Sequence, residues 1–486
     1  MNRAITQTAW LMIALWLAAA SLKAAGLNVL YNFSSPSAGN SDTNNDGTSP
    51  EAALLLSSNT LYGTAYDGGS NASGTVFKLD TDGSGFMVLH TFTAQLNDSN
   101  FVNSDGYNPR SSLVLSSNTL FGTTSGGGVN GLGNIFAINT DGTGFTNIFA
   151  FGSVSPGGKF PQAGLTLSGQ TLYGTTQLGG ITNGTVFRIN TDGTGFTNLY
   201  SFSLGGYTSH SINTNGDGSQ PYGVLVLSGN VLYGTTQLGG VSGAGTVFRV
   251  NTDGTDFTNL HSFNAVVTSR LQHTINSDGA NPWSGLALSG NTLYGTTYDG
   301  GTNGTGAVFK LNTDGTGFTN LCSFNGINPV NSTNIGGANP YASLVLSGST
   351  LYGTANQGGP GGGTIFAVQT NGTGFTNLYN FGSIGAQTNA SGPYAGFVLS
   401  GNLLYGTTSG GGSGLNGTVF AWTLPAPIPL NIQMTGGKMV LNWTDATFAL
   451  QAAPTVAGSF TNVPGAASPY TNTITGAQQF FRLQSN

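Results

Sequence analysis

Apolar and polar residues alternate in short runs through most of the chain, and the runs recur as one unit. A clear copy covers residues 164–202, with the sequence GLTLSGQTLYGTTQLGGITNGTVFRINTDGTGFTNLYSF. Alternation over a few residues, bounded by Gly, Asn and Asp, is typical of β-strands joined by tight turns. The unit therefore predicts four antiparallel strands, LTLS, LYGT, GTVFRI and TNLYSF, which we call its first, second, third and fourth strands.

The unit occurs seven times. Its second strand begins at a leucine about every 50–60 residues: Leu61, Leu120, Leu172, Leu232, Leu293, Leu351 and Leu404. Its third strand is centred on a phenylalanine: Phe77, Phe136, Phe187, Phe248, Phe309, Phe366 and Phe420. A repeat of four-stranded sheets is the signature of a β-propeller, in which the sheets are arranged radially as blades. The sequence thus predicts an all-β fold with a seven-bladed propeller.

The fourth strand is out of phase with the other three. Its first copy, NVLYNF at residues 28–33, precedes every other strand, and the last unit stops after its third strand near Thr423. If the N-terminal copy pairs with the last third strand, it completes that blade and closes the ring. A linear array would have no reason to leave matching half-units at its two ends.

Four segments are expected. Residues 1–26 read as a signal peptide, because Arg3 precedes the apolar run Ala9–Ala20, which is too short to span a bilayer; an uncleaved anchor is the alternative. Residues 27–424 form the propeller, and 425–429 are a Pro-rich linker. Residues 430–486 read as a small β-sandwich-like domain with strands LNIQM, MVLNW, FALQAA, SFTNV and QFFRL. We therefore expect a secreted or cell-surface protein, without a transmembrane span after signal cleavage.

Composition narrows the classes of partner. Only 6% of the residues are charged, the net charge is −6, and no basic patch is visible, so nucleic acid is not an expected partner. The single cysteine, Cys322, excludes an internal disulfide and is expected to be a small core residue. Oligomeric state cannot be read from these features.

The loops fall into two classes. Turns after the first and third strands are short and nearly constant, whereas loops after the second and fourth strands vary. In an antiparallel blade, the variable loops all emerge on one face. Because binding usually resides in variable loops on a rigid scaffold, we expect one ligand-facing surface there.

Each loop before a first strand ends in proline. The residues that follow these prolines are Glu51, Arg110, Gln162, Tyr222, Trp283, Tyr341 and Tyr394. Since the first strand should be innermost, the seven side chains are expected to ring the mouth of the central channel. Four consecutive aromatic residues opposite polar ones suit a sugar, which stacks on rings and needs hydrogen bonds for its hydroxyls. The alternative is that the aromatic side chains only plug the channel.

Two loops resemble the first half of a calcium-binding loop. Their candidate ligands are Asp42, Asn44 and Asp46 in one loop and Asn213, Asn215 and Asp217 in the other. The acidic residue expected at the twelfth position is replaced by Ala53 and Val224. Calcium is the only cofactor that the sequence suggests, and ordinary turn chemistry is the alternative.

Catalysis has little support. Glu51 is the only glutamate, and glycoside hydrolysis usually needs two opposed carboxylates, for which Asp46 or Asp105 would be the partner. The histidines lack zinc-binding spacing. His90 and His261 occupy the same position of the fourth strand as Tyr200, which favours a structural role. An enzyme is therefore not the favoured interpretation.

The recurring LYGTT, GG and GTVFxINTDGTGFTNLYSF segments resemble the GloVer tandem repeat of bacterial "choice-of-anchor" proteins over residues 28–423. The resemblance implies an exported, propeller-like protein with an exchangeable C-terminal sorting or anchoring segment, and it brings no catalytic residues. Three functions remain open. The first is a module that binds a polysaccharide or cell-surface glycan, the second a structural or adhesive surface protein, and the third a polysaccharide-acting enzyme.

Overall fold

The computed structural model describes most of the chain. The described residues are 26–36, 43–95, 101–152, 157–180, 183–207, 213–268, 274–326, 334–382, 390–424, 431–435, 438–443, 448–453, 461–473 and 480–485. Across these ranges the protein consists of strands and turns, and no helix is long and apolar enough to cross a membrane. The expected signal peptide, apart from Gly26, and the expected linker 425–429 lie outside them.

The chain divides into two compact units, which we describe separately. One is Leu27–Trp422, and the other includes Thr423–Asn486. The first sheet of Leu27–Trp422 contains β2 (Leu55–Ser57), β3 (Thr60–Ala65), β4 (Thr75–Asp80) and β5 (Met87–Thr91), in that spatial order. All neighbouring strands in it are antiparallel. These are the first to fourth strands of the repeat, and we call the sheet blade 1.

The same strand order recurs in six further sheets of the described chain, blades 2 to 7. Blades 2 to 4 consist of β6 (Val114–Ser116), β7 (Thr119–Thr124), β8 (Asn134–Asn139) and β9 (Thr146–Ala150); β11 (Thr166–Ser168), β12 (Thr171–Thr176), β14 (Thr185–Asn190) and β15 (Thr197–Ser201); and β19 (Val226–Ser228), β20 (Val231–Leu238), β21 (Thr246–Asn251) and β22 (Thr258–Ser262). Blades 5 to 7 consist of β25 (Ala287–Ser289), β26 (Thr292–Thr297), β27 (Ala307–Asn312) and β28 (Thr319–Ser323); β30 (Val345–Ser347), β31 (Thr350–Ala355), β33 (Thr364–Gln369) and β34 (Thr376–Asn380); and β35 (Val398–Ser400), β36 (Leu403–Thr408), β37 (Thr418–Thr423) and β1 (Leu27–Asn32).

Short strand pairs decorate the variable loops. They are β10 (Gly158–Lys159) with β13 (Leu178–Gly179), β16 (Gly206–Tyr207) with β17 (Asn213–Thr214), β23 (Val267–Thr268) with β24 (Thr274–Ile275), and β29 (Asn334–Ala338) with β32 (Gln357–Gly359). A further strand, β18 (Ser219–Pro221), pairs with β20.

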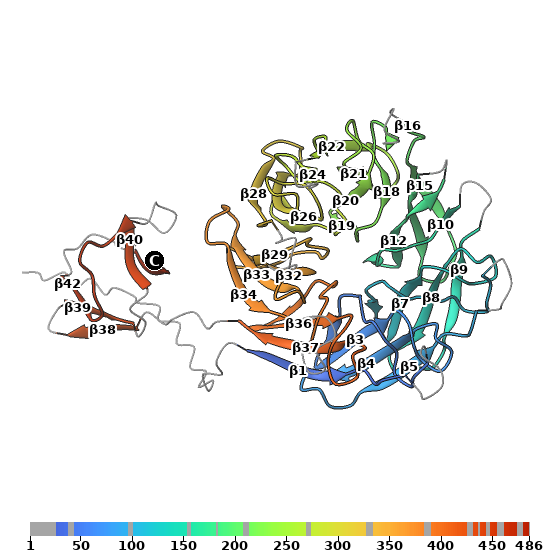
Figure 1. Ribbon diagram of the computed structural model, residues 1–486, viewed down its shortest axis with the longest axis horizontal. Coiled ribbons are helices and arrows are strands. Elements are labelled where there is room, and N and C mark those ends of the chain that lie inside the picture. Colours follow the sequence, from blue (N-terminus) through green and yellow to red (C-terminus); the bar gives the residue numbers. More distant parts are fainter. Residues whose placement is uncertain are drawn as a thin grey trace, which may run out of the picture. The chain divides into compact units, whose positions relative to one another are not determined.

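The N-terminal strand completes the last blade. β1 is antiparallel to β37, with Leu27 opposite Trp422 and Asn32 opposite Thr418. Figure 1 shows the sheets of this unit arranged radially, with β1 (blue) beside β37 (red-orange). The predicted all-β, propeller-like fold is confirmed, and the strand that closes the ring is the one that the phase of the repeat indicated.

The glycine of the LYGT motif has a packing role. Gly63 lies opposite Phe77 of the third strand, and a Cβ at Gly63 would be only 2.5 Å from the Cζ atom of that ring. The other blades repeat the close approach at 2.5–2.8 Å with Gly122, Gly174, Gly234, Gly295, Gly353 and Gly406. The second strand therefore needs a residue without a side chain, so that the phenylalanine can lie beneath it.

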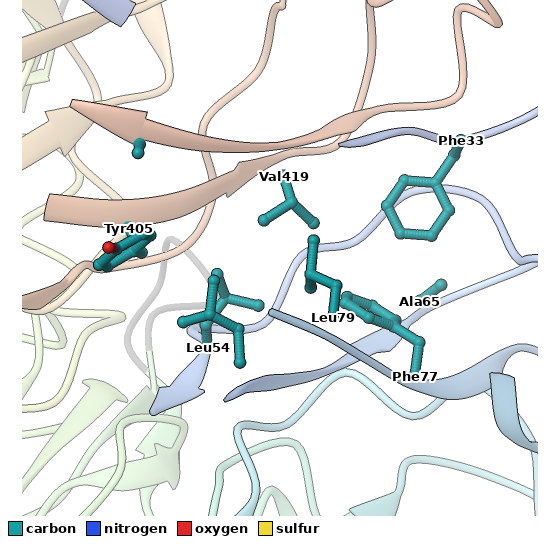
Figure 2. Packing of buried hydrophobic residues seen from close by; sticks show 9 residues of the cluster. Phe33, Leu54, Ala65, Phe77, Leu79, Tyr405 and Val419 are labelled. Atoms are coloured by element: carbon teal, nitrogen blue, oxygen red, sulfur yellow. The ribbon is translucent and has the colours of Figure 1, made fainter. Parts of the chain in front are cut away.

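The hydrophobic core lies in the seams between neighbouring blades. At the seam that closes the ring, Phe33 and Val419 of blade 7 pack with Leu54, Phe77 and Leu79 of blade 1, and all five are buried (Figure 2). Because each sheet buries its faces against its neighbours, the blades stabilise one another. Cys322 packs against the corresponding cluster of blades 5 and 6, as expected of a core residue.

The second unit contains two three-stranded sheets. One has the order β38 (Asn431–Thr435), β39 (Lys438–Asn442) and β42 (Tyr470–Thr473), and the other β41 (Thr461–Asn462), β40 (Phe448–Ala453) and β43 (Phe480–Ser485). Leu441, Trp443 and Leu450 form its buried cluster. The strand β42 was not expected from the sequence.

Candidate ligand site at the channel mouth

The seven residues that follow the recurring prolines of the repeat meet in one cavity of the unit Leu27–Trp422. All of them line a cavity of about 100 Å³, together with the residues that follow them in each first strand. These are Ala52, Ala53, Ser111, Ser112, Ala163, Gly164, Gly223, Val224, Ser284, Gly285, Ala342, Ser343, Ala395 and Gly396. The first strands are therefore innermost, and the sequence-predicted ring of side chains, which we call the channel mouth, is assembled.

A recurring backbone turn aims these side chains at the axis. The residue before each proline has a positive φ, from 54° to 66°, at Ser49, Asn108, Phe160, Gln220, Asn281, Asn339 and Gly392. Its amide N–H donates to a carbonyl in the preceding blade, as Asn108 N does to Ser73 O (3.0 Å) and Asn281 N to Ala244 O (2.8 Å). Each first strand thus begins from a point fixed to its neighbour, which makes the ring rigid.

The aromatic side of the mouth is continuous. The ring centroids of Tyr222 and Trp283 are 4.7 Å apart, those of Trp283 and Tyr341 5.0 Å, and those of Tyr341 and Tyr394 5.3 Å. Tyr298 lies 6.0 Å from Trp283 and 6.1 Å from Tyr341, so it extends the arc outward. The sequence reasoning missed Tyr298, although its position directly after an LYGTT motif could have placed it near the mouth.

The polar side is held by an ion pair. The Arg110 guanidinium donates to Glu51 Oε2 from Nε at 2.7 Å and to the Tyr222 hydroxyl at 3.0 Å, and it lies 4.8 Å from the centre of the Tyr66 ring. Burial raises the pKa of Tyr341, so its hydroxyl stays protonated and can donate. The Oε1 atom of Gln162 is buried and has no hydrogen-bond partner among the described residues. The mouth therefore offers donors and an acceptor opposite the arc.

The calcium candidates that the structure describes make hydrogen bonds within their own loops and to the preceding strand or loop. Asp46 accepts hydrogen bonds from Tyr31 Oη (2.8 Å) and Ser34 N (2.9 Å), and Asn44 Oδ1 accepts from the amides of Gly47 and Gly69, both at 2.9 Å. In the second loop, Asp217 and Asn215 make the matching bonds. Asp42 and the side chain of Asn213 lie outside the described residues.

Their oxygens are thus used within the protein, and the described chain contains no group of three His, Cys, Asp or Glu side chains that would hold a metal ion. The described candidates Asn44, Asp46, Asn215 and Asp217 already accept hydrogen bonds within the protein. They fit the alternative of turn chemistry, in which Asn and Asp fasten the loop to the fourth strand.

Histidine replaces tyrosine in two copies of this motif. His90 Nε2 lies 2.9 Å from Asp105 Oδ2, and His261 Nε2 lies 3.1 Å from Asp278 Oδ2. Burial alone would raise the pKa of Asp105, but hydrogen bonds from His90 and Thr93 outweigh it and lower the pKa. The structural role expected for both histidines agrees with these contacts. Asp46 and Asp105, the carboxylates considered as catalytic partners of Glu51, are both engaged in this motif instead.

Comparisons with solved structures concern the fold alone. An oligogalacturonate lyase in complex with manganese is 11% identical, with 83% of this chain and 98% of that chain covered and a TM-score of 0.44. An oligogalacturonate lyase from Vibrio parahaemolyticus is 9% identical, with 83% and 99% covered and a TM-score of 0.44. A putative 6-phosphogluconolactonase from Bacteroides fragilis is 14% identical, with 88% and 100% covered and a TM-score of 0.41. No curated protein matches the chain in sequence.

The sequence model of the Gloeobacter/Verrucomicrobia repeat matches residues 21–209 and 264–428. Between these regions lie β19 to β22, which nevertheless form a sheet with the same strand order as the other blades. The two matched regions cover most of the chain, so the protein belongs to the Gloeobacter/Verrucomicrobia repeat (GloVer) family.

Proposed function

We propose that the protein is an exported or cell-surface binding module that holds a carbohydrate at the channel mouth. One observation carries the proposal: an unbroken arc of aromatic side chains faces the Glu51–Arg110 pair and Gln162 across a single cavity. Sugars present both apolar CH faces and hydroxyls, and ligand sites commonly combine aromatic walls with a few polar groups. The two sides of the mouth match these two demands.

The size of the cavity limits how the sugar binds. At about 100 Å³ it is smaller than the roughly 300–1,000 Å³ of enclosed ligand pockets. A sugar ring would therefore lie across the mouth, stacked on Trp283 or Tyr341, with hydroxyls directed to Gln162 and Arg110. This geometry favours an extended glycan over an enclosed monosaccharide.

Two alternatives make different predictions. In a structural or adhesive surface protein, the aromatic arc would only plug the channel, and the small cavity is compatible with this role. A polysaccharide-acting enzyme would depend on Glu51, whose carboxylate is paired with Arg110 at 2.6 Å. Turnover that is abolished by Glu51→Gln would favour the enzyme.

A glycan array with the purified protein tests the proposal. Binding to a subset of glycans is expected, with Trp283→Ala abolishing it because the substitution interrupts the arc. Phe101→Ala is the matched control, since Phe101 is an exposed aromatic residue that does not line the mouth. Binding should be unchanged by a calcium chelator. If the folded protein bound no glycan on the array, the structural alternative would replace the proposal.

A further inference from the structure

The junction between blades 6 and 7 lacks a side chain that bridges other junctions. At three junctions the residue before the proline is asparagine, and its Nδ2 donates to a main-chain oxygen of the preceding blade. These bonds run from Asn108 to Tyr66 O (3.0 Å), from Asn281 to Gln237 O (3.2 Å) and from Asn339 to Tyr298 O (2.9 Å). At the blade 6–7 junction this residue is Gly392, so this side-chain hydrogen bond is missing there.

A cavity occupies the corresponding space. We call it the blade 6–7 pocket; its volume is about 380 Å³, and its lining includes Asn356, Ser391, Gly392, Tyr394 and Ser409. This volume falls within the roughly 300–1,000 Å³ of small-molecule sites. Tyr394 also lines the channel mouth, so the two cavities share a wall.

Asn356 gives the pocket an unused polar group. The residue is only 7% exposed and lines the pocket. Its main-chain N–H donates to Asn339 O at 3.3 Å, whereas its side-chain amide makes no hydrogen bond to any residue that the structure describes. Proteins usually satisfy the polar atoms of such a mostly buried side chain with protein, water or ligand. The Asn356 amide can both donate to and accept from a ligand hydroxyl.

The chemistry of the lining selects the kind of ligand. Its side chains are amides, hydroxyls and one tyrosine ring, and none of the lining residues carries a charge. A phosphate or carboxylate would find no cation there, and a purely apolar ligand would leave the Asn356 amide unpaired. A neutral, hydroxyl-rich ring that contacts Tyr394 satisfies both conditions.

We propose that the blade 6–7 pocket is a subsite for one neutral sugar residue of the glycan that lies on the channel mouth. This inference rests on the proposed function, and it adds a direction: the glycan runs from the arc over Tyr394 toward the seam of blades 6 and 7. Tyr394 contacts two successive sugar residues, and Asn356 hydrogen-bonds the one in the pocket.

Gly392→Asn closes the pocket with a residue that the fold already uses. The φ of Gly392 is 66° and that of Asn108 is 54°, and a serine hydroxyl donates to the carbonyl of each, from Ser409 (3.1 Å) and from Ser125 (3.0 Å). The added Cβ would lie 2.8 Å from Ser409 Oγ, the end of a rotatable side chain. The new amide is expected to reach Asn356 O and fill the seam.

Gly401→Asn is the matched control. Gly401 lies in the same blade with a φ of 59°, and a Cβ there would meet no atom within 4 Å. Asn356→Ala is a second variant, which removes the amide but leaves the pocket open. Thermal unfolding of all variants verifies that each is folded.

The readout is calorimetric titration with the longest glycan that the wild-type protein selects on the array. Gly392→Asn and Asn356→Ala are each expected to weaken binding by about tenfold, the effect of one lost hydrogen bond to a ligand, while Gly401→Asn binds like the wild type. If Trp283→Ala abolished binding but both pocket variants bound normally, the subsite would be wrong and the proposed function would stand. Loss of binding only in the pocket variants would instead remove the channel mouth as the site.

Discussion

Two aspartates at equivalent positions of the repeat make hydrogen bonds of different length. Asp67 and Asp299 follow the second strands of blades 1 and 5. Asn108 Nδ2 donates to Asp67 Oδ1 at 2.7 Å, whereas Asn339 Nδ2 lies 3.5 Å from Asp299 Oδ1, the long limit for such a bond. Burial raises the pKa of Asp299 to about 6. Asp299 is thus a mostly buried carboxyl group whose charged form is stabilised only by a long hydrogen bond.

Asp299→Asn is therefore expected to stabilise the protein at neutral pH. The pKa of Asp299 in the folded protein lies above its unfolded value of about 3.9. Folding is therefore most favourable below about pH 4, where the carboxyl group is protonated in both states, and the unfolding free energy falls as the pH rises through 6. After allowance for solvent screening, the variant should gain about 1–2 kcal/mol in unfolding free energy at pH 7.5. Urea unfolding of the wild type and Asp299→Asn at pH 7.5 and at pH 4 measures this gain in unfolding free energy. Equal gains at both pH values, or the same gain in Asp67→Asn, would contradict the electrostatic cause.

For single residues, the sequence identifies special positions but not their interaction partners. The seven channel-mouth residues could be predicted because each follows a proline at a fixed place in the repeat. The sequence pattern predicts a calcium ligand at Asp46, but its hydrogen-bond partners, Tyr31 and Ser34, lie in the preceding strand and loop. Nothing in the local pattern links Asp46 to them. The blade 6–7 pocket could not be predicted, since it arises from a side chain that Gly392 lacks.

A glycine of the second strand is paired with a phenylalanine of the third strand in every blade. In blade 4, Gly234 lies opposite Phe248, and a Cβ at Gly234 would be 2.6 Å from Phe248 Cζ and 2.8 Å from Leu225 Cδ2. Both neighbours are buried, so neither can move without disturbing the seam. The LYGT motif recurs because this contact requires glycine at the same place of every second strand. The recurrence allows the strands to be predicted from the sequence.

Gly234→Ala is expected to destabilise the protein by about 1–3 kcal/mol, the usual cost of overpacking a core. Gly216→Ala is the matched control, because Gly216 has an ordinary φ and a Cβ there meets nothing within 4 Å. Denaturant unfolding compares the two. The double variant Gly234→Ala, Phe248→Leu should recover part of the lost unfolding free energy. If the effects of the two substitutions were simply additive, the Phe248 ring would not be what the new Cβ collides with.

Other elements leave no trace in the pattern. The paired strands β10 and β13 have two residues each, too few to show alternation. The strand β42 carries the sequence YTNT, which resembles the polar turns of the repeat. Both depend on their partner strands more than on their own residues, so sequence periodicity could not find them.

The whole ring depends on β1. Deletion of residues 27–33 would remove Phe33, which is fully buried in the seam, and leave β37 as an exposed edge. Loss of one buried phenylalanine alone typically costs about 3–5 kcal/mol, and an open edge invites pairing between chains. We expect a lower midpoint of urea unfolding and association in size-exclusion chromatography.

Re-attachment of the strand distinguishes its two roles. In a variant of the Leu27–Trp422 unit, the deleted strand is placed after Trp422 through the turn of residues 190–195, which joins the third and fourth strands of blade 3. This variant should regain the unfolding midpoint and remain monomeric if the undeleted unit is monomeric. Failure to regain stability would mean that β1 acts through its chain connection to blade 1 and not through β37.

The pairing of β1 with β37, in which Leu27 lies opposite Trp422, joins the two ends of the unit and therefore strands that are synthesised far apart in time. Ribosomes add roughly 5–20 residues per second, so β1 emerges on the order of 20–80 seconds before the strand it needs. During that interval the nascent chain carries a β-rich segment with an unmatched edge at its beginning, a target for chaperones and for neighbouring chains. The first strand to be synthesised is thus among the last to find its place.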